Sequence, residues 1–134
     1  MIKKISLLLV LSLLIFSCEN NTETNNTIEG KWNVTQIIGG FAQPRTYVED
    51  TFTWTFNFDE NTVTIINISQ PFNSLYTPTF SNDQGGVYTF KIETENNIDY
   101  LVVGERRGIM TLNGNDLTID YGIAFDDVAY IFKR

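Results

Sequence analysis

The chain has 134 residues, enough for one domain, and its formal net charge is −7 at pH 7. It contains no histidine and a single cysteine, Cys18, which excludes Ser-His-Asp or Cys-His catalysis and an internal disulfide. An acidic chain without a basic run is repelled by phosphate backbones, so we expect no nucleic-acid partner.

Residues 1–17 have the layout of a secretory signal peptide. MIKK is a short basic start, and ISLLLVLSLLIF is an apolar run too short to span a bilayer as a mature helix. Ser17 then precedes Cys18, and the segment IFSC resembles a bacterial lipobox, which implies cleavage before the cysteine and lipid attachment to it. We expect a lipoprotein of the cell envelope that is anchored in the outer membrane. The sequence does not decide between the periplasmic and the outer face of that membrane. An ordinary signal peptide followed by a free thiol is the alternative.

Residues 18–28 are expected to form the lipidated cysteine and a flexible tether, because ENNTETNNT is polar and has no large apolar residue. Cleavage removes Lys3 and Lys4 and leaves seven basic against sixteen acidic residues, a net charge of −9. That charge gives no attraction to anionic lipid, so the acyl chains alone would hold the protein at the membrane. The folded domain is expected over 29–134.

Within the domain the hydrophobic period is two, which indicates strands. In TFTWTFNF the aromatic residues at 52, 54, 56 and 58 face one way, and the threonines and Asn57 face the other. VYTFKIE, LTIDY and VAYIFKR alternate similarly, and DENT, ETENN and NGND are turn signals between such runs. No stretch predicts an amphipathic helix. The eight expected strands are 31–38, 49–58, 62–68, 87–93, 98–103, 107–112, 116–121 and 127–134.

Eight consecutive strands with one apolar face predict an all-β, antiparallel up-and-down barrel, because closure removes exposed edges. An open two-sheet sandwich is the alternative. The aromatic residues expected on the inner face are Phe52, Trp54, Phe56, Phe58, Tyr88, Phe90, Tyr100, Tyr121, Tyr130 and Phe132. Because successive connections alternate between the ends, Trp32 should lie close to Arg134, where an indole and a guanidinium would stack.

Gly30 and Trp32 at the start of the first strand, with Arg134 closing the last, resemble the lipocalin signature. The order of lipobox, polar tether, GKWNVT and YIFKR is similar to that of lipocalin-like domains of bacterial lipoproteins. The resemblance covers Gly30 to Arg134. It implies that Gly30, Trp32 and Arg134 form a structural plug in the barrel floor, and that Trp32 is not a ligand contact.

The two long connections between strands, GGFAQPRTY and SQPFNSLYTPTFSNDQGG, are expected at the barrel end opposite Trp32. Long loops commonly carry function. We expect this end to bind a small apolar or amphipathic molecule. Its ligand-binding candidates are Phe41, Tyr47, Phe72, Tyr76, Phe80, Phe125, Arg45 and Arg106. Arg45, Arg106 and Arg107 would meet an anionic head group unless nearby carboxylates pair them.

Two alternatives to a ligand pocket stay open. In the first, the loops cap a barrel filled by its own side chains. In the second alternative, the protein is a non-catalytic interaction module whose aromatic loops dock on an envelope protein or a glycan. A carboxylate pair such as Glu49 with Asp127 suits glycoside cleavage, but nothing in the sequence places the two at a useful separation. We therefore expect a monomeric protein that is not an enzyme, with no catalytic residue, metal site or cofactor.

Overall fold

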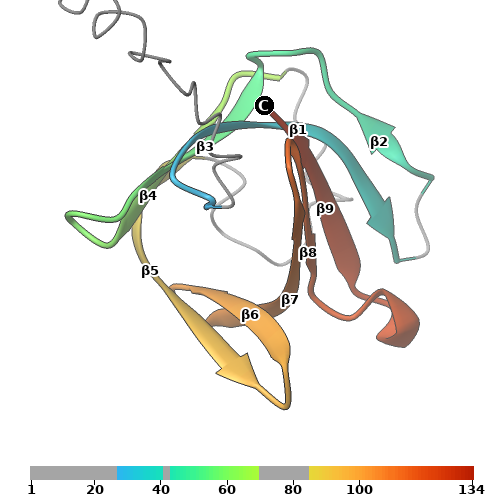
Figure 1. Ribbon diagram of the computed structural model, residues 1–134. Helices are drawn as coiled ribbons and strands as arrows, with labels where there is room; N and C mark the ends of the chain where they lie inside the picture. The colour runs from blue at the N-terminus through green and yellow to red at the C-terminus, as the bar shows by residue number, and fades with distance from the viewer. Residues whose placement is uncertain (1–26, 41–42, 70–84) are drawn as a thin grey trace, which may run out of the picture.

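The computed structural model describes residues 27–40, 43–69 and 85–134 (Figure 1). Its elements are β1 (Gly30–Gly39), β2 (Arg45–Thr46), β3 (Phe52–Asn57), β4 (Thr62–Asn67), β5 (Gly86–Glu95), β6 (Ile98–Val103), β7 (Arg106–Asn113), β8 (Asp116–Asp120), the 3-10 turn η5 (Ile123–Phe125) and β9 (Val128–Lys133). Among these residues, no helix has the length and apolar character needed to cross a membrane.

Apart from β2, the strands form the predicted eight-stranded antiparallel up-and-down barrel. Each strand from β3 to β8 pairs with the next in chain order, and β1 pairs with both β3 and β9. The circle is therefore closed, and the sandwich alternative is wrong. β1 pairs with β3 from Gly30 to Asn33 and with β9 from Asn33 to Gly39, and the pairing with β9 shifts register between Val34 and Gln36, as at a β-bulge.

The predicted strand 49–58 begins later than expected, at Phe52. Asp50 has a positive φ of 64°, which is turn geometry, and its N–H donates to the Asn33 side chain at 2.8 Å. The short strand β2, which was not predicted, pairs with β1 through Ile37 and Arg45. A turn thus replaces the first residues of the expected strand.

Aromatic rings fill the space enclosed by β1, β3, β8 and β9. Trp54 lies with its ring centroid 5.3 Å from that of Phe132 and 5.7 Å from that of Tyr130. On the other side, Phe56 and Phe90 meet edge to face at 5.2 Å. These buried rings confirm the inward alternation predicted for β3 and β9 and supply much of the core.

Tyr100 was wrongly expected on the inner face. Its ring lies on the outside of β6, with the Arg107 guanidinium carbon 3.4 Å from the ring centroid, while Leu101 and Val103 are buried inside. The two-residue turn at Asn96 and Asn97 fixes this register, because both residues have the positive φ of a type I′ hairpin.

The hairpin of β5 and β6 extends past β4 and projects from the barrel (Figure 1). The register of β4 with β5 runs from Thr62 opposite Thr89 to Ile65 opposite Gly86, so β5 continues past β4 as far as Glu95. Ile92 on the inner face is therefore 39% exposed instead of buried. Phe58, also expected inside, lies in the turn after β3 and is 36% exposed.

Candidate functional site

The barrel floor is the end at which β1 starts and β9 ends, and Trp32 is fully enclosed there at 0% exposure. Its indole Nε1 donates to the Ile28 carbonyl at 2.8 Å, and the Arg134 guanidinium carbon lies 4.4 Å from its ring centroid. Arg134 also donates to the Glu29 carbonyl at 3.2 Å. The predicted contact of Trp32 with Arg134 is present, beside Gly30 at a φ of 94° that favours glycine. Trp32 is thus surrounded by protein.

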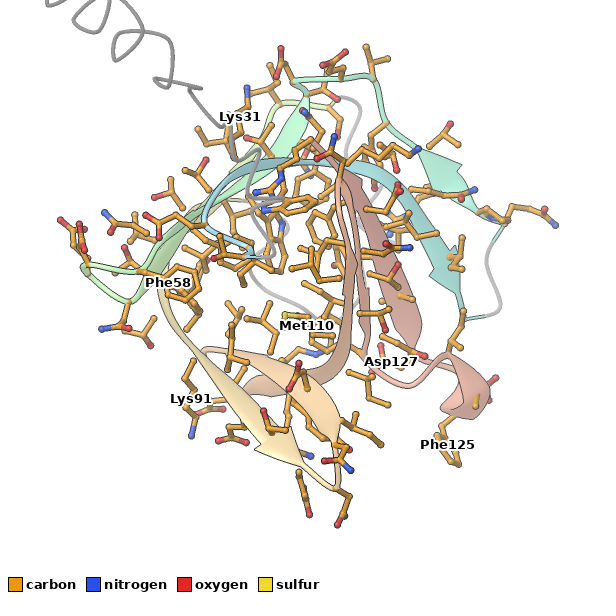
Figure 2. The ribbon with its side chains drawn as sticks, viewed as in Figure 1. Lys31, Phe58, Lys91, Met110, Phe125 and Asp127 are labelled. Atoms are coloured by element: carbon orange, nitrogen blue, oxygen red, sulfur yellow. The ribbon has the colours of Figure 1, made fainter. Side chains whose placement is uncertain are left out.

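Arg106 is carried to the opposite, loop-rich end of the barrel by the first position of β7. Alternation along β7 turns Arg106 and Met110 inward and Arg107 outward, and Figure 2 shows Met110 pointing into the barrel. The Arg106 side chain is 21% exposed, and its Nη2 donates to Asp127 Oδ2 at 2.6 Å. Its guanidinium carbon lies 4.4 Å from the Tyr121 ring centroid. A partly buried cation is therefore fixed between a carboxylate and an aromatic ring.

Ring contacts join this cation to the opposite side of the loop-rich end. Tyr121 meets Tyr130 at 5.8 Å, Tyr130 meets Phe52 at 6.3 Å, and Phe52 meets Tyr47 at 5.2 Å. We call this set the mouth cluster. Its members are Tyr47, Phe52, Arg106, Tyr121, Asp127 and Tyr130. It places the ion pair of Arg106 and Asp127 at one end of a row of aromatic rings, of which Phe52 and Tyr130 are buried. A cation beside aromatic rings is an arrangement that suits an amphipathic molecule.

The loop between β8 and β9 positions Asp127. Asp120 accepts hydrogen bonds from the N–H groups of Gly122 and Ile123, both at 2.8 Å, and this fixes the start of η5. Asp126 then takes a positive φ of 66°, which reverses the chain toward β9. Asp127 accepts from the Val128 N–H at 2.8 Å through Oδ1 and from Arg106 through Oδ2. Both carboxylate oxygens are therefore engaged.

The predicted ligand-binding residues separate in the structure. Tyr47 and Arg106 both belong to the mouth cluster. Arg45 lies on β2 and is half-buried, whereas Phe125 on η5 is 88% exposed and extends away from the barrel (Figure 2). The other predicted site residues, Cys18, Phe41, Phe72, Tyr76 and Phe80, lie outside the described residues.

Arg107, also expected at the loop-rich end, belongs to an ion-pair network on the outer face. It donates to Glu93 at 3.2 Å and to Glu95 at 2.7 Å, across the ring of Tyr100. The hydrogen bond from Lys91, reinforced by Arg107, holds the pKa of the Glu93 carboxyl below its ordinary value. This network is exposed to solvent, and its role in stability is correspondingly modest.

The contacts of Tyr121 and Asp127 with Arg106 were not recognised from the sequence. The alternation of RRGIMTLN would have separated Arg106 from Arg107, but no local pattern pairs Arg106 with a carboxylate twenty-one positions away. Across the part of the chain that the structure describes, no group of three or more His, Cys, Asp or Glu residues is arranged to hold a metal ion. No protein-family model, curated protein or solved structure matches the chain.

Proposed function

We propose that this protein is an exported, lipid-anchored binding protein of the lipocalin-like kind, which takes a small amphipathic molecule with an acidic head group at its loop-rich end. The observation that carries the proposal is the inward position of Arg106. It is a partly buried cation at the rim of an aromatic interior. A guanidinium recognises a carboxylate or phosphate through charge-assisted hydrogen bonds, and the adjoining rings suit an apolar body.

Asp127 and an acidic head group would share the Arg106 guanidinium. Asp127 engages Nη2 of Arg106, and the planar guanidinium has five N–H donors arranged around its edge. The ion pair and the Tyr121 ring hold the group in one orientation, so little side-chain entropy is lost when a ligand binds. An acidic head group would therefore add to a fixed cation.

The position of the tether supports capture from solution. The described chain enters at the floor, where the Ile28 carbonyl binds Trp32, and the mouth cluster lies at the opposite end. A membrane anchor at Cys18 would then leave the mouth directed away from the bilayer, within the freedom that a polar tether allows.

Arg106→Met is expected to weaken binding of a fluorescent C16 fatty acid by about tenfold or more, the usual effect of losing a hydrogen bond to a charged group. Arg107→Met is the matched control, since it removes the next arginine of β7 from the outer face. Fluorescence titration of both variants measures the effect. Arg106→Met leaves the Asp127 carboxylate without its cation, so the double variant Arg106→Met/Asp127→Leu is titrated in parallel to remove that carboxylate as well. Equal affinities for Arg106→Met and Arg107→Met would contradict the proposed site.

Docking on an envelope protein or a glycan is the second candidate, and the exposure of Phe125 favours it. A large aromatic side chain directed into solvent from a short 3-10 turn suits a contact with another surface. The same titration separates the two functions, because a docking module without a ligand site binds the fatty acid in none of the variants.

Cys18→Ala is expected to release the protein from the membrane fraction. Cys18 is the only cysteine in the chain, and no other residue replaces it as the attachment point for acyl chains. Stable anchoring requires more than one chain, because a single acyl chain binds membranes only marginally. Cell fractionation followed by immunoblotting measures the distribution. Membrane association that survives the substitution would overturn the lipid-anchor proposal.

A further inference from the structure

One edge of β5 is left without a strand partner in the described part of the chain. On the side of β4, the last backbone link is the hydrogen bond from the Phe90 N–H to the Asn61 carbonyl at 3.0 Å. On the other side, β6 accompanies β5 all the way to Glu95, which lies opposite Ile98. Residues 91–95 therefore form a paired strand on one side and an open edge on the other.

The turn geometry determines which backbone groups face this edge. Because a two-residue turn separates Glu95 from Ile98, these two form a hydrogen-bonded pair, and Glu93 points the same way. Ile92 and Thr94 then direct their N–H and C=O groups away from β6, as Phe90 does. Neither has a backbone partner among the described residues. Each offers one donor and one acceptor to an added strand.

Apolar surface accompanies the open edge. Ile92 faces the barrel interior opposite the buried Leu101, yet it is substantially exposed because β4, which begins opposite Thr89, does not extend alongside it. The Phe58 ring meets the Phe90 ring edge to face at 5.2 Å and is exposed beside the same edge. Figure 2 shows Phe58 at the turn after β3 and Lys91 directed outward. An added strand would thus find apolar contacts on its inner side.

The charge around the edge is negative. Asp59 and Glu60 lie exposed in the turn that contacts Phe90, and no ion pair joins either to another described residue. The nearby cations Lys91 and Arg107 are paired with Glu93 and Glu95. A basic partner is therefore electrostatically complementary to this edge, and an acidic one is repelled.

We propose that the edge of β5 over residues 91–95 binds an extended basic polypeptide segment as an added strand. The segment makes main-chain hydrogen bonds to Ile92 and Thr94 and packs apolar side chains against Ile92 and Phe58. A basic residue at one end lies near Asp59 and Glu60. The unpaired main-chain groups favour a peptide over a lipid, whose acyl chain has no donor or acceptor for them. The site is separate from the mouth cluster.

The test uses the full-length protein and a fluorescein-labelled Lys-Val-Lys-Val-Lys-Val peptide, followed by fluorescence anisotropy. Binding should slow amide exchange at Ile92 and Thr94 by about tenfold or more, while the amides of Lys91 and Glu93 are protected with and without peptide. A Glu-Val-Glu-Val-Glu-Val peptide should not bind. Failure of the basic peptide to bind, or equal binding of the acidic one, overturns the proposal.

Thr94→Pro provides the sharpest variant, with Thr94→Ala as its control. Proline removes the N–H that faces the open edge and leaves the ladder to β6 intact, while alanine keeps the N–H. Binding should fall about tenfold or more in the proline variant and stay unchanged in the alanine variant. A basic peptide N-methylated at alternate amides repeats the test on wild-type protein and should not bind. Unchanged binding of the N-methylated peptide contradicts the proposal. So does protection of the Ile92 and Thr94 amides from exchange that appears without peptide and rises with protein concentration, because it identifies a second copy of this chain as the occupant.

Discussion

Trp32→Ala is expected to lower the free energy of unfolding by about 3–5 kcal/mol, the usual cost of truncating a large buried aromatic residue. Trp32 is completely enclosed, and its loss would open a cavity in the floor. The substitution also removes the hydrogen bond to the Ile28 carbonyl and the stack with Arg134. Since a small domain is stabilised by only about 5–15 kcal/mol in total, the barrel would be close to unfolding.

Urea unfolding followed by the fluorescence of Trp54, which stays buried in the core, measures this loss. Arg134→Gln is the matched control. It removes the cation and leaves the indole in place, so the expected loss is only about 0.5–1 kcal/mol. A Trp32→Ala variant that kept its full stability and lost ligand binding would instead identify Trp32 as a binding residue.

Gly39→Ala is expected to destabilise the barrel by about 2 kcal/mol or more. Gly39 has a φ of 99°, which strains any residue with a Cβ by about 1–3 kcal/mol. A Cβ there would lie 2.5 Å from the Asp127 carbonyl oxygen and 2.6 Å from Cγ1 of Ile123. Relief of these overlaps requires β1 to move away from the loop before β9, which adds the cost of an overpacked contact, about 1–3 kcal/mol.

Gly30→Ala separates the two causes of the lost stability, backbone strain and steric overlap. Gly30 has a similar φ of 94°, but a Cβ there meets nothing within 4 Å, so this variant reports backbone strain alone. Thermal or urea unfolding of both variants should show the larger loss for Gly39→Ala. Because Asp127 is bound to Arg106, Gly39→Ala should also weaken fatty-acid binding, whereas Gly30→Ala should not. Equal stability losses would contradict the steric argument.

Local alternation explains why most of the barrel was predictable. Each run of threonines and aromatics specifies a strand and its inner face without reference to the rest of the chain. The errors arise where that information is not local. IDYLVV has no clear period, and the turn at Asn96 and Asn97 decides that Tyr100 faces outward. Ile92 is exposed because β4 begins at Thr62, opposite Thr89, and does not reach as far as β5, and this stagger depends on how the whole barrel closes.

The candidate site was predictable to a smaller extent. Alternation along β7 sends Arg106 inward, and the chain topology brings Tyr47 to the same end. The partner of Arg106 depends on the irregular path through η5, where a positive φ at Asp126 aims Asp127 at the guanidinium. Such a conformation has no periodic signature in the sequence, so the sequence could offer Asp127 as one of several carboxylates near the arginines but could not pair it with Arg106 in particular.

The pairing of β9 with β1 has a consequence for how this protein folds. Val34 and Phe132 lie side by side in the closed barrel although they are far apart in the chain. Contacts of such long sequence separation make folding slow, because the entropy of closing a large loop is lost before the contacts form. Until β9 arrives, the free edges of β1 and β8 are both open to other chains. The time between synthesis of β1 and docking of β9 is therefore the period in which the nascent barrel is most prone to aggregate.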